Sequence, residues 1–64
     1  MDIRAIRERC GMTQEELAEM TNVTIGYISH LETGKRTNPS VAVLRKLATA
    51  LNVTVDDLFE QKAC

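Results

Sequence analysis

Tryptophan is absent from this 64-residue chain, and its only aromatic residues are Tyr27 and Phe59. A domain this short buries a small core, which must here be built mainly from aliphatic side chains. Hydrophobic residues nevertheless make up 44% of the sequence, a share typical of a globular chain and not of a disordered one. We therefore expect a single domain over residues 1–64, with its folded core at roughly 3–59.

Long apolar runs are also absent, and no stretch approaches the roughly 20 residues that a membrane-spanning helix needs. The chain begins Met1-Asp2-Ile3-Arg4, which is charged and leads into no apolar segment of the kind found in secretory signals. We therefore expect no membrane partner and a cytoplasmic location.

Residues that bind metals or catalyse reactions are scarce. His30 is the only histidine, and Cys10 and Cys64 lie far apart in the sequence. Zinc sites need about four ligands in closely spaced pairs, and the chain has no phosphate-binding glycine loop or nucleophile with a partner base. Asp56 and Asp57 fit the first turn of a helix, where carboxylates favour the helix dipole. The sequence predicts no metal, no cofactor, no small-molecule substrate and no enzymatic activity, and it assigns no role to Cys64.

The net charge of −1 is unevenly distributed along the chain. Residues 24–49 carry +3, while residues 1–23 and 50–64 carry −2 each. The charged residues of the central segment are Lys35, Arg36, Arg45 and Lys46, opposed by Glu32 alone. This polarity favours a phosphate-facing surface backed by acidic flanks, and a solvated surface that arose by chance is the alternative.

Helix start and stop signals divide the chain into five short segments. Apolar residues recur at helical spacing in the first segment, at Ile3, Ile6 and Cys10. The later segments begin with residues that can cap a helix, namely Thr13, Thr24, Ser40 and Thr54. Residues suited to end a helix follow at Gly11, Asn22, Gly34 and Asn52. Since no segment alternates with a period of two, we expect an all-α fold of five short helices.

The connection between the second and third segments is the most informative feature of the sequence. About three residues separate them, and so short a connection forces a sharp angle between two helices. Ala18 provides a small side chain where the helices approach, and Asn22 tolerates a left-handed turn. Val23, Ile28 and Leu31 supply apolar side chains at the crossing. A helical hairpin shares some of these features, but the whole set predicts a helix-turn-helix.

The residues around this turn resemble the phage-repressor family of helix-turn-helix proteins, the Cro/CI-type or XRE family. The matching segments are Gln14-Glu15-Glu16-Leu17-Ala18, Val23-Thr24, Ile28-Ser29-His30-Leu31-Glu32-Thr33-Gly34-Lys35 and Asn38-Pro39-Ser40. The resemblance covers roughly residues 3–59. It implies a lambda-repressor-like domain of five helices that binds double-stranded operator DNA as a homodimer and regulates transcription.

Two positions depart from this pattern. Asn22 lies where the family usually has glycine, although both residue types adopt the left-handed turn. Gly26 lies on the exposed face of the predicted third helix, where glycine is about 1 kcal/mol less favourable than alanine. Gly26 therefore indicates either a close approach of the backbone to DNA or tolerance of glycine in a first helical turn.

The third helix is the expected DNA-reading element, since its N-terminal part enters the major groove in such folds. Ile28 and Leu31 face the core, so the outward positions are Thr24, Ile25, Gly26, Tyr27, Ser29 and His30. Ile25 can pack on a thymine methyl group, while Ser29 and His30 can hydrogen-bond to base edges. The alternative for each of these residues is an ordinary solvated side chain.

The DNA backbone is expected to meet two other parts of the chain. Gln14 begins the second helix, where free N–H groups favour phosphate, and the resembled family uses a glutamine there to hold the backbone. The loop after the third helix supplies the other candidates, which are Lys35, Arg36, Thr37 and Asn38. Arg45 and Lys46 on the fourth helix suit either phosphate contact or simple solvation.

Arg7 and Glu32 are expected to form a structural pair without a direct DNA contact. Glu32 is the sole acid in the basic segment and needs a partner. The resemblance also implies a pairing of an arginine on the first helix with the glutamate that closes the third.

The C-terminal part is the expected dimer interface. Leu58 and Phe59 follow a capping box in a helix too short to bury both side chains, so we expect an exposed apolar patch. The main functional prediction is a sequence-specific, repressor-like transcriptional regulator on a two-fold symmetric operator. The alternative is a protein-interaction module of the same fold that binds a toxin or another regulator.

Overall fold

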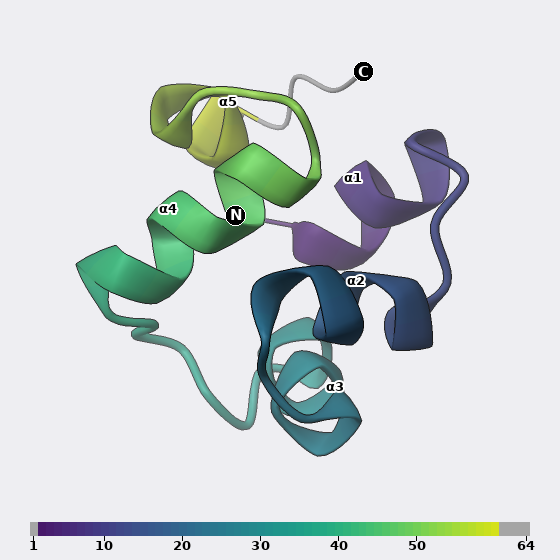
Figure 1. Ribbon diagram of the computed structural model, residues 1–64. Helices are drawn as coiled ribbons and strands as arrows, with labels where there is room; N and C mark the ends of the chain where they lie inside the picture. The colour runs from purple at the N-terminus through teal and green to yellow at the C-terminus, as the bar shows by residue number, and fades with distance from the viewer. Residues whose placement is uncertain (1, 61–64) are drawn as a thin grey trace.

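The computed structural model describes residues 2–60, which form five α-helices (Figure 1). The helices are α1 (Ile3–Arg9), α2 (Gln14–Thr21), α3 (Ile25–Thr33), α4 (Val41–Ala50) and α5 (Val55–Glu60). Residues 2–60 contain no strand, so the predicted all-α fold is confirmed. Cys64 lies outside the described residues. Within the described part, no helix combines the length and hydrophobicity needed to cross a membrane.

The helices begin at the predicted capping residues. Thr13 accepts a hydrogen bond from the Glu16 N–H at 3.0 Å, and the Glu16 carboxylate accepts from the Thr13 N–H at 2.9 Å. Thr54 and Asp57 form the same reciprocal pair at the start of α5. Side-chain oxygens therefore satisfy N–H groups that a helix leaves free in its first turn. The cap of α1 was not predicted: Asp2 accepts a hydrogen bond from the Ala5 N–H at 3.0 Å.

Residues with a left-handed backbone conformation end both α2 and α3. Asn22 has φ 57° directly after α2, and Gly34 has φ 87° directly after α3. Most side chains are strained in this region, whereas asparagine and glycine adopt it readily. The predicted ends of α2 and α3 are therefore confirmed.

The core is aliphatic, as the scarcity of aromatic residues predicts. Its fully buried apolar side chains are Ile6, Leu17, Ile28, Leu47, Leu51 and Leu58. Helix α2 packs against both α3 and α4, while α1 packs against α3 and α5 against α4. Figure 1 shows α2 crossing above α3, with an extended loop leading from α3 to α4. The central position of α2 fixes one face of α3 against the rest of the domain.

The prediction of an exposed patch formed by both Leu58 and Phe59 is wrong for Leu58. Leu58 is fully buried, whereas Phe59 is 58% exposed. Consecutive helical residues point about 100° apart, so only one of the two can face the core from the short α5. Leu58 belongs to the hydrophobic core, and Phe59 remains as the exposed apolar residue.

Candidate nucleic-acid interface

The turn between α2 and α3 has the geometry predicted for a helix-turn-helix. The Asn22 N–H donates to Glu19 O at 3.3 Å, and the Val23 N–H donates to Ala18 O at 3.1 Å. Ala18 is buried in the core, and Val23 packs against the core. These backbone bonds satisfy carbonyls at the end of α2 and direct the chain into α3 within three residues.

Helix α3 has one face in the core and another that is accessible. Ile28 is fully buried and Leu31 packs against the core, as predicted. All six residues predicted to contact bases retain accessible surface: Thr24, Ile25, Gly26 and His30 are exposed, and Tyr27 and Ser29 are half-buried. Gly26 is not required by local crowding, since a Cβ there would meet only Thr24 Oγ1 at an ordinary 3.9 Å.

The loop after α3 folds back along the helix. The Arg36 N–H donates to His30 O at 3.0 Å. The Arg36 guanidinium lies over the Tyr27 ring, with Cζ 5.3 Å from the ring centroid, a cation–π distance. Arg36 was predicted, with Lys35, Thr37 and Asn38, to be a loop residue that contacts phosphate. All four are exposed, but the Arg36 side chain also packs on Tyr27 of α3.

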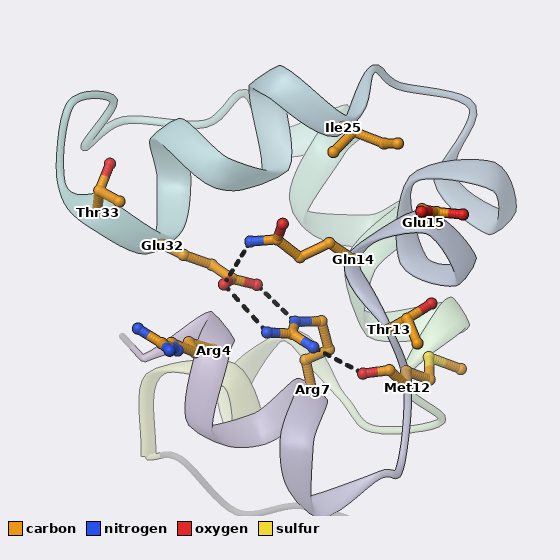
Figure 2. Close-up of a pocket in the computed structure, with 9 residues that line it drawn as sticks. All are labelled: Arg4, Arg7, Met12, Thr13, Gln14, Glu15, Ile25, Glu32 and Thr33. Carbon is orange, nitrogen blue, oxygen red and sulfur yellow. Dashed lines mark hydrogen bonds and ion pairs between the residues drawn. The ribbon is translucent and has the colours of Figure 1, made fainter.

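Near the C-terminal end of α3, Glu32 forms the predicted ion pair with Arg7 of α1 (Figure 2). Arg7 Nε donates to Glu32 Oε2 at 2.7 Å, and Nη2 donates to Oε1 at 3.2 Å. Arg7 Nη1 also donates to Met12 O at 2.7 Å, which ties the α1–α2 loop to the pair. The side chains are 11% and 3% exposed. Hydrogen bonding to Glu32 raises the pKa of Arg7 above its usual value, although burial opposes this rise.

Gln14 joins this cluster through a contact that was not predicted from the sequence. Its Nε2 donates to Glu32 Oε1 at 3.0 Å. Gln14 was predicted at the start of α2 as a phosphate contact, and it does begin that helix. The bond to Glu32 spans 18 residues of sequence and joins two helices. No local pattern indicates such a contact.

Two open hollows flank these residues. One, of about 520 Å³, is lined by Arg7, Gln14 and Glu32 and is also bordered by Arg4 and Ile25. The other, of about 430 Å³, is bordered by Ile3, Leu31, Pro39 and Phe59. Among the described residues, no group of three or more His, Cys, Asp or Glu is arranged to hold a metal ion.

Comparisons with known proteins agree with this geometry. Residues 3–58 match the helix-turn-helix family model. The chain is 46% identical over 57 residues to an uncharacterised HTH-type transcriptional regulator from Archaeoglobus fulgidus, covering 89% of this chain and 80% of the relative. It is 40% identical over 58 residues to the HTH-type transcriptional regulator SlrR of Bacillus subtilis, covering 91% of this chain and 38% of SlrR.

A third relative is the HTH-type transcriptional regulator DdrOP3 of Deinococcus deserti. It is 38% identical over 58 residues, which cover 91% of this chain and 44% of DdrOP3. The chain thus spans less than half the length of SlrR and DdrOP3.

Proposed function

Because this chain belongs to the XRE (Cro/CI-type) helix-turn-helix family, we propose that it reads an operator by inserting α3 into the major groove of DNA. It is a helix-turn-helix protein of the transcriptional-regulator class and not an enzyme. The observation that carries the proposal is the accessible face of α3, opposite the face held by the core. In this account the chain works in the cytoplasm as the DNA-binding part of a transcriptional regulator.

The exposed side chains of α3 suit base recognition. Ile25 is 46% exposed and offers an apolar surface for a thymine methyl group. Ser29 and His30 can donate to or accept from base edges. Gly26 has no side chain, so the backbone of α3 could approach the groove closely at this position. Tyr27, stacked by Arg36, lies at the edge of this surface, and Thr24 caps the helix.

The DNA backbone would be held on both sides of α3. Lys35, Thr37 and Asn38 are exposed in the loop that follows α3, next to Arg36. Gln14 lies at the start of α2 and borders the first hollow. Arg45 and Lys46 are exposed on α4 and extend the basic segment. Together, residues 24–49 place a charge of +3 on the part of the chain that would face phosphates.

Two copies would bind a two-fold symmetric operator as a homodimer. Phe59 is 58% exposed and borders the second hollow together with the apolar side chains of Ile3, Leu31 and Pro39. Such an operator requires the two α3 helices of the dimer to lie about 34 Å apart, the spacing of symmetric half-sites. Sedimentation under reducing conditions tests pairing through Phe59. Phe59→Ala should shift a concentration-dependent dimer to monomer, and a wild-type chain that is monomeric at high micromolar concentration would contradict it.

The salt dependence of binding tests the proposed function. If Lys35, Arg36, Arg45 and Lys46 each neutralise one phosphate, the dimer should show a log–log slope of about −7. The measurement is a fluorescence titration of labelled duplex DNA between low and moderate salt. A flat response would exclude DNA as the main partner and favour the protein-interaction alternative, for which the exposed Ile25 is the residue to examine.

A further inference from the structure

We propose that Glu32 is a positioning residue, which holds the side chain of Gln14 where Gln14 can bind a DNA phosphate. Arg7 acts one step further back, because it fixes Glu32. The inference rests on the proposed DNA-binding function and assigns this buried cluster a part in it. The sequence-based interpretation treated Arg7 and Glu32 as structural and Gln14 as an independent contact.

The position of the Gln14–Glu32 bond in the fold supports this role. Helices α2 and α3 are joined at one end by the turn around Asn22. Gln14 is the first residue of α2, and Glu32 lies in the last turn of α3. Their 3.0 Å bond therefore links the two helix ends remote from the turn, as Figure 2 shows. The bond and the turn together fix where the start of α2 lies relative to the recognition helix.

The Glu32 side chain is itself held in one orientation, so it can fix the position of Gln14. Its carboxylate receives three hydrogen bonds, two from Arg7 and one from Gln14. Only 3% of the Glu32 side chain is exposed. Arg7 is held in turn by Met12 O at 2.7 Å. A glutamine in water loses side-chain entropy when it binds a phosphate, and a side chain already held in one orientation loses less.

Gln14 retains the means to bind a phosphate in this arrangement. A primary amide nitrogen carries two hydrogens, and Glu32 Oε1 accepts only one from Nε2. The backbone N–H groups at the start of α2 point in the direction that favours an anion. The charge of Glu32 would repel a phosphate, but Arg7 compensates it at 2.7 Å. The cluster therefore presents an oriented donor without a net negative charge behind it.

The test replaces the ion pair with apolar residues of similar size. The variant Arg7→Met/Glu32→Leu removes the acceptor of Gln14 and leaves the net charge of the chain unchanged. Apolar replacement of a buried ion pair often preserves or increases stability, so this variant is expected to fold. It is compared with wild type, with Gln14→Ala and with the triple variant, each shown by circular dichroism to be folded at the assay temperature.

We expect Gln14→Ala and the apolar variant to weaken binding to all sequences by about tenfold per half-site, the effect of one hydrogen bond to a charged group. The triple variant should bind no more weakly than Gln14→Ala, because Glu32 acts through Gln14. The salt slope should change little, since Gln14 carries no charge. Equal affinity of wild type and the apolar variant, or additive losses in the triple variant, would overturn the proposal.

A phosphate-specific measurement separates positioning from general support of the fold. Single operator phosphates are replaced by neutral methylphosphonates, and the affinity loss at each position is recorded. Wild type should be sensitive at the phosphate held by Gln14, while Gln14→Ala and the apolar variant should lose sensitivity at that same position only. Retained sensitivity in the apolar variant would refute the role of Glu32, whereas wild type that binds no DNA would refute the proposed function itself.

Discussion

The two faces of α3 differ in how far the protein itself holds their side chains. On the inner face Ile28 is fully buried, and Glu32 accepts three hydrogen bonds at 3% exposure. On the outer face Ile25 and His30 are exposed. A helix of nine residues thus combines a fixed side, which sets its position, with an accessible side that is free to meet a partner. Changes on the inner face should affect stability first, with Glu32 affecting binding only through Gln14, and changes on the outer face should affect binding directly.

The largest effect on stability is expected at the inner face. Arg7→Ala should lower the free energy of unfolding by about 1–3 kcal/mol, because it leaves the buried Glu32 carboxylate without its main donor. Thermal and urea melts of Arg7→Ala, Glu32→Gln and the double variant measure this loss. Strictly additive effects in that cycle would show that the two side chains do not interact.

Substitutions of basic residues in the loop after α3 should weaken binding with little change in stability. Lys35→Ala should weaken binding to all sequences alike and make the salt slope shallower by about one unit per half-site. Arg36→Ala should do the same, since Arg36 is also exposed in this loop and carries a positive charge. Arg36→Lys is the control, because it keeps the charge but loses the planar group that stacks on Tyr27. A change in the preferred base with Lys35→Ala would contradict its assignment to the backbone.

The smallest effect, and the clearest separation of the two faces, is expected at Gly26. Gly26→Ala should stabilise the fold by up to about 1 kcal/mol, since alanine favours helix and the site has room for a Cβ. The same methyl group should weaken DNA binding, because it would stand between the helix backbone and the groove. Melting curves and titrations on one preparation measure both. Unchanged affinity would show that Gly26 is merely tolerated there.

Local patterns in the sequence predicted the helices well. The caps at Thr13 and Thr54, and the left-handed Asn22 and Gly34, depend on interactions within a few residues. The side of α5 that faces the core was not predicted, because it depends on where α4 lies. Leu58 was therefore wrongly assigned to an exposed patch.

The candidate site was predicted in outline, but its internal contacts were not. The outer residues of α3 follow from helical periodicity, and the Arg7–Glu32 pair followed from the family resemblance. The Gln14–Glu32 bond joins residues 18 apart, and the Arg36–Tyr27 stack depends on how the loop folds back. Both need the relative placement of helices, which periodicity and capping residues do not supply.

Selection of bound sites from a random pool of duplex DNA tests the central claim most directly, that the outer face of α3 reads bases. Wild type should enrich two symmetric half-sites about one helical turn apart. His30→Ala, which keeps the backbone carbonyl that accepts from Arg36, should relax the preference at one base pair in each half-site. A wild-type pool without enrichment, or the same preferences in both His30→Ala and Ile25→Ala as in wild type, would contradict the account.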